Sequence, residues 1–134
     1  MLSFLAFPIP FDFTYLSKLF SIETPPSPLY NEIKTDKYGN HSLSWMLIPN
    51  HNIHYYSIEI THVGGIEPKL MYNTLNGNQN SFSIPSSDLT DGNLYNIKVR
   101  GAVRVDKDTV IYGAWSPEMM FKKGTGMFCD YDAK

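Results

Sequence analysis

The sequence predicts an all-β protein, built as a seven-stranded Greek-key β-sandwich in which two antiparallel sheets enclose one hydrophobic core. Three observations lead to this prediction. From residue 25 onward, short stretches of alternating apolar and polar residues are separated by clusters of Asn, Gly, Pro, Asp and Ser, a pattern typical of half-buried antiparallel strands. Apolar residues at helical spacing are absent from this part of the chain. The length of 134 residues, of which 43% are apolar, is enough for one such domain, which needs about 100 residues.

Three regions are expected along the chain. An apolar N-terminal extension covers residues 1–24, the β-domain covers residues 25–123, and a short C-terminal tail covers residues 124–134. The first boundary is predicted at Pro25, Pro26 and Pro28, because closely spaced prolines forbid a helix and favour an extended, polyproline-like linker.

The N-terminal extension is unusually apolar, since 14 of its first 22 residues are apolar or aromatic. A secretory signal has a basic residue before its apolar run and a small-residue cleavage site after it. Here no Lys or Arg precedes the run, Pro8, Pro10 and Asp12 interrupt it, and no such cleavage site follows. Three interpretations stay open: a degenerate or truncated signal, an ordered segment packed on the domain, and an incorrect or partial amino terminus. No transmembrane span is predicted, because the uninterrupted run falls far short of about 20 apolar residues.

The strands of the domain follow from its alternation and its turn residues. We expect them at residues 30–36, 43–47, 55–61, 69–75, 81–84, 95–105 and 115–121, with a hairpin return at residues 109–112 before the last one. The period of two then directs one set of side chains inward, namely Leu43, Trp45, Leu47, Tyr56, Ile58, Ile60, Phe82, Ile84, Tyr95, Ile97, Val99 and Gly101. Between these, Ser57, Glu59 and Thr61 are expected to face water.

Three motifs, in this order, resemble those of the fibronectin type III family over roughly residues 25–123. The segment Leu43-Ser44-Trp45, followed by Pro49, resembles the second strand of that family. The segment Leu89 to Val99 has the family's leucine six residues before a tyrosine, here Tyr95, and then alternating aliphatic residues. The segment Gly113 to Pro117 resembles the start of the family's final strand.

The resemblance implies roles for individual residues. Trp45 would fill the space between the two sheets, where a buried ring is the largest single contributor to a small core. Tyr95 would place its ring in the core and return its hydroxyl to a backbone group of the preceding corner. The residues expected to anchor the core are Trp45, Tyr56, Leu89, Tyr95 and Trp115.

The sequence also departs from the family's pattern. Asp91 stands where the family often has proline, and Gly101 stands where it often has alanine, so we expect a looser corner and a looser strand end. Trp115-Ser116 is similar to half of the tryptophan-serine box of class I cytokine receptors, whose membrane-proximal domain has the same fold. The second Trp-Ser pair is missing, since Glu118-Met119 follows Pro117.

Charge and cysteine content limit the classes of partner. Eleven basic and thirteen acidic residues leave a formal charge of −2, so no global field attracts the phosphates of a nucleic acid or an anionic membrane. Cys129 is the sole cysteine, which excludes a disulfide within the sequence and is compatible with either redox compartment.

Catalytic and metal-binding patterns are not found. His51, His54 and His62 could be considered as metal ligands, but His54 and His62 would lie about 26 Å apart along an extended strand, and a site needs three or four converging ligands. No Gly-x-Ser-x-Gly elbow is present, and the glycines near Gly124 lack the lysine and helix of a phosphate-binding loop. We therefore predict no enzyme, no cofactor and no metal.

Binding is expected to use loops or a sheet edge, because the strand interiors form the core. The connection from Arg104 to Thr109 is the richest in charge, with Asp106, Lys107 and Asp108, and it stands where the family has its adhesive loop. The connection from Pro49 to Ile53 would lie at the same end. Asn40-His41-Ser42 is the only Asn-x-Ser/Thr tripeptide and falls at the turn before the second strand, so Asn40 is a candidate for N-glycosylation.

These observations predict a non-enzymatic protein–protein interaction or adhesion module, of extracellular or cell-surface location, whose partner is another protein. One alternative is an intracellular structural or scaffolding domain. Another is a fragment of a cytokine-receptor-like or other multidomain receptor.

Overall fold

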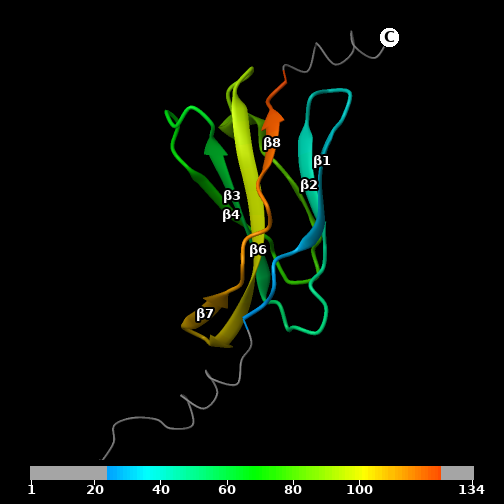
Figure 1. Ribbon diagram of the computed structural model, residues 1–134, viewed down its shortest axis with the longest axis vertical. Helices are drawn as coiled ribbons and strands as arrows, with labels where there is room; N and C mark the ends of the chain where they lie inside the picture. The colour runs from blue at the N-terminus through cyan, green and yellow to red at the C-terminus, as the bar shows by residue number, and fades with distance from the viewer. Residues whose placement is uncertain (1–23, 125–134) are drawn as a thin grey trace, which may run out of the picture.

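The computed structural model describes residues 24–124 (Figure 1). This part of the chain forms strands and one short 3-10 turn. The elements, in order, are β1 (Leu29–Thr35), β2 (His41–Met46), β3 (Tyr55–His62), β4 (Leu70–Asn73), β5 (Ser81–Ser83), η2 (Ser86–Asp88), β6 (Leu94–Asp106), β7 (Thr109–Tyr112) and β8 (Met119–Lys122).

Two antiparallel sheets form the sandwich. One sheet has the strand order β1-β2-β5, and the other has the order β4-β3-β6-β7, with β8 also paired to β6. Figure 1 shows the two sheets face to face, with the long strand β6 running through the larger one. The prediction of an all-β Greek-key sandwich is therefore confirmed.

The strand count differs from the prediction of seven, because the described part of the chain has eight strands. The hairpin return expected at residues 109–112 is the additional strand, β7, which pairs with the end of β6, and the last strand, β8, is shorter than the predicted 115–121 and pairs with the beginning of β6. Between them, Pro117 has no amide to donate to the ladder. Instead, the Ser116 hydroxyl accepts the backbone N–H of Val99 (3.0 Å), while the Ser116 N–H donates to the carbonyl of Val99 (2.8 Å).

The core lies between the sheets and contains most of the predicted inward-facing residues. It consists of Leu43, Trp45, Ile48, Tyr56, Ile58, Ile60, Ile84, Leu89, Tyr95, Ile97, Val99 and Phe121. Trp45 and Tyr56 touch across the sandwich, with ring centroids 5.2 Å apart. At about 25 cal/mol for each Å² of apolar surface removed from water, these large side chains supply much of the stability of a domain this small.

Two predicted orientations are wrong. Leu47 is 36% exposed, because β2 ends at Met46 and the chain turns away before Pro49. Ile48 is buried instead, and its N–H donates to the Tyr56 hydroxyl (2.8 Å). Ser57 does not face water, since β4 and β6 flank it on both sides and it is buried.

Trp115 is also placed differently from the prediction, because it is not part of the core cluster. Its ring is only partly buried and lies over two cations, with Arg100 Cζ 4.2 Å and Lys98 Nζ 4.8 Å from its centroid. Both cations point outward from β6, whose buried residues alternate with them. Trp115 therefore covers the outer face of the larger sheet rather than the space between the sheets.

The corner before β6 is closed by Tyr95, as the resemblance implies. The Tyr95 hydroxyl accepts the backbone N–H of Thr90 (2.8 Å) and donates to Glu67 Oε1 (2.7 Å). Asn93 donates to the other Glu67 oxygen (2.7 Å). The hydrogen bond from Tyr95 is the main cause that lowers the pKa of Glu67. Asp91 is paired with Lys123, the residue directly after β8, which connects this corner to the final strand.

The second departure from the family's pattern, Gly101, is packed closely against two side chains. A Cβ at Gly101 would lie 3.0 Å from Ile48 Cδ1 and 3.1 Å from Ile53 Cδ1, so two isoleucines fill the space that alanine would need.

The proline cluster is not the extended linker that the sequence predicts, because Pro25 and Pro28 are fully buried. The backbone carbonyl of Pro25 accepts the N–H of Ala114 (3.3 Å). The proline segment is therefore packed as part of the domain.

Candidate protein-binding surface

One end of the sandwich is formed by three connections that are distant in sequence. The β6–β7 hairpin, the β2–β3 connection and the β4–β5 connection meet there, at the lower end of Figure 1. They enclose a polar cleft of about 620 Å³ lined by Asn52, Ile53, His54, Asn76, Gly77, Asn78, Arg104, Val105, Asp106 and Lys107. We call these three connections the loop end.

Arg104 holds two of these connections together. Its Nε donates to His54 Nε2 (3.1 Å), and its Nη1 donates to the backbone carbonyl of Lys107 (2.7 Å). Because a guanidinium can only donate, the Nε2 atom of His54 is the acceptor. Arg104 therefore fixes the hairpin against the β2–β3 connection, and the sequence reasoning that chose it as a contact residue did not foresee this role.

The hairpin tip presents charges of both signs. Lys107 and Asp108 are exposed and Asp106 is half-buried. The Asp106 carboxylate accepts the backbone N–H of Asp108 (2.9 Å), and a register shift between Arg104 and Asp106 interrupts the ladder at this point. The residues predicted as a binding loop thus lie together on one ordered tip.

Gly77 brings the third connection close to the second. A Cβ at this position would lie 1.7 Å from the carbonyl oxygen of Ile53, which no side chain allows. Only glycine permits the two backbones to approach this closely. No sequence signal pointed to Gly77 as part of the loop end, because the approach is between residues distant in sequence.

A second surface covers the outer face of the larger sheet. Arg100 lies over the rings of Tyr112 (3.8 Å) and Trp115 (4.2 Å). Burial, together with the hydrogen bond to the Tyr112 hydroxyl (2.9 Å), raises the pKa of Tyr55 to about 12, so it stays neutral near pH 7. The aromatic faces are already occupied by cations, which makes this layer a covering of the sheet rather than an open binding site.

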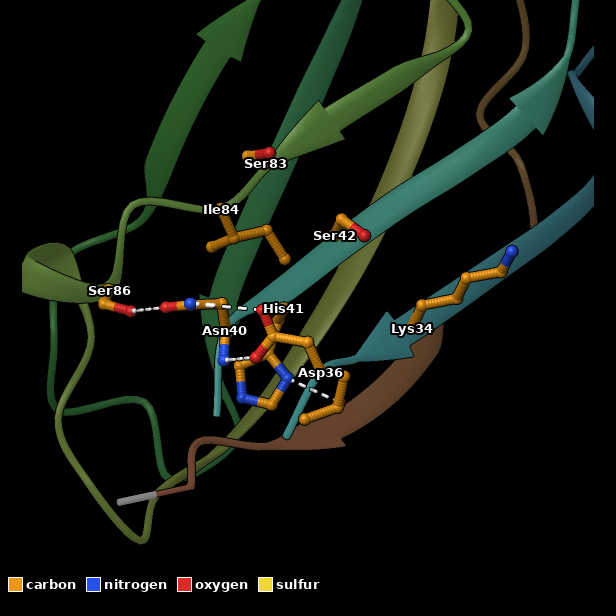
Figure 2. Close-up of a pocket in the computed structure, with 9 residues that line it drawn as sticks. Lys34, Asp36, Asn40, His41, Ser42, Ser83, Ile84 and Ser86 are labelled. Carbon is orange, nitrogen blue, oxygen red and sulfur yellow. Dashed lines mark hydrogen bonds between the residues drawn. The ribbon is translucent and has the colours of Figure 1, made fainter. Parts of the chain in front are cut away.

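A second cleft, of about 710 Å³, lies at the opposite end, beside the turn between β1 and β2 (Figure 2). His41 is buried at its base, and Nδ1 of its ring lies 2.8 Å from the Thr35 hydroxyl. Burial, followed by the positive charge of Lys123, lowers the pKa of His41. Asn40 is exposed at the rim of this cleft, and it is the only predicted site residue located there.

The predicted histidines occupy separate places. The His51 ring lies 3.0 Å from the carbonyl of Pro49, His54 contacts Arg104, and His62 Nδ1 accepts the N–H of Ile66 (3.2 Å). Within residues 24–124, no group of three or more His, Cys, Asp or Glu side chains is arranged to hold a metal ion. Residues 1–23 and Cys129 lie outside the described part of the chain.

Within residues 24–124, no helix is long and apolar enough to span a bilayer.

Comparisons with known proteins support the fold. No protein-family model matches the chain, and no curated protein matches it. Among solved structures, a myokine is similar with a TM-score of 0.59 and 15% identity, covering 75% of this chain and 99% of the myokine chain. The FN1-FN3 domains of chicken CNTN1 are similar with a TM-score of 0.60 and 15% identity, covering 75% of this chain and 31% of that one.

Both similarities cover three quarters of this chain. At 15% identity it establishes the fold and not a function. The chain therefore has the fold of a fibronectin type III-like domain.

Proposed function

We propose that this chain is a non-enzymatic protein-binding module that contacts its partner through the loop end. The observation that supports this most directly is the set of hydrogen bonds made by Arg104, which hold the β6–β7 hairpin against the β2–β3 connection. Because the loops are already ordered, a partner would immobilise fewer groups on binding, and this lowers the entropy cost of association.

The chemistry of the loop end favours a polar partner with charges of both signs. Asp106, Lys107 and Asp108 alternate in sign at the tip, and Asn52, Asn76 and Asn78 are among the residues that line the adjacent cleft. Charge complementarity at such a rim affects association rate and specificity more than raw affinity. A protein with matching charges is thus the partner class that this end would select.

An extracellular or cell-surface location is part of the proposal. It is supported by the similarity of the fold to a myokine and to chicken CNTN1 domains. An intracellular scaffolding domain remains the alternative. Recovery of the full chain from the medium or the cell surface, rather than from the cytosol, would support the extracellular location.

The test compares charge reversal at the two ends of the sandwich. The tagged full chain is cross-linked to intact cells, and the captured proteins are quantified by mass spectrometry for wild type, for the double variant Lys107→Glu/Asp108→Lys, and for Lys37→Glu as a control. Lys37 is exposed in the turn between β1 and β2. We expect proteins enriched by the wild type to be lost with the double variant and retained with Lys37→Glu.

The proposal is contradicted if the double variant captures the same proteins at the same level. Unfolding of each variant in urea is measured in parallel, and surface substitutions of this kind are expected to change stability by no more than about 0.5 kcal/mol. Loss of capture by a variant of unchanged stability can then be assigned to the loop end.

A further inference from the structure

The outer face of the three-stranded sheet is polar in the part next to Asn40, and apolar at its far end, where Leu29 pairs with Met46 and both are exposed. The strand registers place two rows of residues across it, Lys34-Ser42-Ser83 and Glu32-Ser44-Ser81. Leu43, between the two rows on β2, and Trp45, after the second row, point into the core. Protein interfaces are depleted in Ser, Lys and Glu, and their binding energy comes mainly from Trp, Tyr and Arg. The part of the face next to Asn40 therefore lacks the residue types that a protein partner needs.

Asn40 stands at the end of this face, directly before β2. It is exposed, and Figure 2 shows its side chain directed toward Ser86 along the rim of the cleft of about 710 Å³. The turn that presents it is well ordered, because the Asp36 carboxylate accepts the backbone N–H groups of Tyr38 and Asn40, both at 2.9 Å. The amide is thus held at the surface in a defined position.

The residues after Asn40 complete an acceptor tripeptide. Asn40-His41-Ser42 is the only Asn-x-Ser/Thr sequence in the chain, and such a tripeptide is the recognition element for N-glycosylation in the secretory route. The acceptor Asn40 stands directly before β2, beside four serines of β2 and β5 that face outward, Ser42, Ser44, Ser81 and Ser83. The motif and the surface are two independent observations.

We propose that Asn40 carries an N-linked glycan whose first sugars lie in this cleft and cover the polar part of the outer face of the β1-β2-β5 sheet. The proposal rests on the extracellular location proposed above. In the transfer, Asn40 Nδ2 forms a bond to the anomeric carbon of an oligosaccharide carried on a lipid diphosphate. The bond from that carbon to the phosphate oxygen breaks, the lipid diphosphate leaves, and Nδ2 loses one proton.

The structure accommodates this bond. Nδ2 has two hydrogens, and one of them is directed to Asp36 Oδ2 (3.2 Å). Glycosylation replaces one hydrogen and leaves the other for Asp36. The cleft has the size of small-molecule sites, about 300–1,000 Å³, and the hydroxyls of Ser42, Ser83 and Ser86 line it. A glycan in this place leaves the loop end, at the opposite end of the sandwich, open to a partner.

The first experiment determines whether Asn40 is modified. The full chain is expressed with its own amino terminus in eukaryotic cells and treated with an amidase that releases N-glycans and converts the acceptor Asn to Asp. We expect glycan loss and an Asp at position 40 for wild type, for Ser42→Thr and for the control Asn80→Gln. Asn40→Gln and Ser42→Ala are expected to lack the glycan.

Failure has two distinguishable forms. An unmodified Asn40 in folded protein recovered from the medium or cell surface overturns this inference alone. An unmodified Asn40 in cytosolic protein overturns it together with the proposed location. Neither result bears on binding by the loop end, which is tested by the Lys107 and Asp108 variants.

The second experiment determines whether the glycan covers the sheet. Lysine amines of the folded protein are acylated before and after enzymatic removal of the glycan, and each lysine is quantified. We expect Lys34 to react several-fold more slowly in the glycosylated protein, while Lys69, whose side chain is 57% exposed on the other sheet, reacts equally in both. Equal reactivity of Lys34 in both forms would overturn the covering of this face.

Discussion

Tyrosine hydroxyls connect the core of this domain to its loops at two places. The ring of Tyr56 is buried, and its hydroxyl accepts the N–H of Ile48 just after β2 (2.8 Å). The ring of Tyr95 is also buried, and its hydroxyl contacts both Thr90 and Glu67. Each tyrosine thus buries an apolar ring in the core and also accepts a hydrogen bond from a backbone N–H that has no partner in the strand ladders.

Removing the Tyr95 hydroxyl tests this arrangement. Tyr95→Phe is expected to lower the free energy of unfolding by about 1–3 kcal/mol, because the Thr90 amide and Glu67 each lose a hydrogen-bond partner. The matched control is Tyr38→Phe, since Tyr38 is 63% exposed, and it should change stability by no more than about 0.5 kcal/mol. Urea unfolding measures both variants. Equal, negligible losses would mean that the corner does not depend on this hydroxyl.

His41 makes stability depend on pH in a defined window. Because its pKa in the folded state is lowered from the ordinary 6.5, the unfolded chain binds a proton first as the pH falls. The contribution of His41 is therefore fully present above pH 6.5 and is lost as the pH falls toward and through the lowered value. The carboxyls with lowered pKa values, Asp36 and Glu67, act at lower pH, below about 4.5.

The measurement is urea unfolding of wild type and His41→Gln at pH values from about 7.5 to about 5. The wild type should lose stability over this range, and the variant should show a smaller slope. The other histidines are the same in both proteins, so the difference isolates His41. An identical slope in the two proteins would show that burial of His41 does not bias its protonation.

At the scale of elements, two short strands, β7 and β8, pair with β6 on either side of a gap that contains Pro117. Pro117 has no N–H for the ladder, and beside it a side-chain hydroxyl, that of Ser116, accepts the N–H of Val99. The two short strands on either side then pair with opposite ends of β6. One side chain thus maintains the edge of the larger sheet across the gap.

Ser116→Ala is expected to cost about 1–3 kcal/mol, because the Val99 amide is left buried without a partner. Ser81→Ala, on the exposed outer face of β5, is the matched control and should stay within about 0.5 kcal/mol. Hydrogen exchange provides a local measurement, since the Val99 amide should exchange faster in Ser116→Ala. Unchanged exchange at Val99 would show that the hydroxyl is dispensable.

At the scale of the whole molecule, aromatic rings form two distinct layers. The first lies between the sheets and contains Trp45, Tyr56 and Tyr95. The second lies on the outer face of the larger sheet, where Tyr112 and Trp115 stack on Arg100. Only the first layer is removed from water on both sides, and it should therefore dominate global stability.

The two tryptophans allow a direct comparison of these layers. Trp45→Ala should cost about 3–5 kcal/mol by opening a cavity in the core. Trp115→Ala should cost about 1 kcal/mol, the order of an exposed cation–π contact. Thermal and urea unfolding of both variants measure the difference. Comparable losses would place Trp115 among the core anchors, as the sequence alone had suggested.

Features of the fold that depend on residues close in sequence could be predicted, and features that depend on residues distant in sequence could not. Alternation along Tyr56, Ile58 and Ile60 predicts a strand and its buried face, since the period of two is a local property. The failures at Leu47 and Ser57 occur where neighbouring strands or the end of a strand decide exposure. Glu67 and Gly77 had no signal at all, because each acts on residues that are distant in sequence.

The amino-acid order by itself determined the fold class, the main core residues Trp45 and Tyr95, the absence of an intrachain disulfide, and the acceptor tripeptide at Asn40. These are properties of local pattern, spacing and composition. Only the tertiary structure decided that Arg104 braces the loop end, that Trp115 lies outside the core, and that Asn40 stands beside a face of serines. Such features depend on which strands become neighbours, and pairing between distant segments is set by the packing of the whole chain.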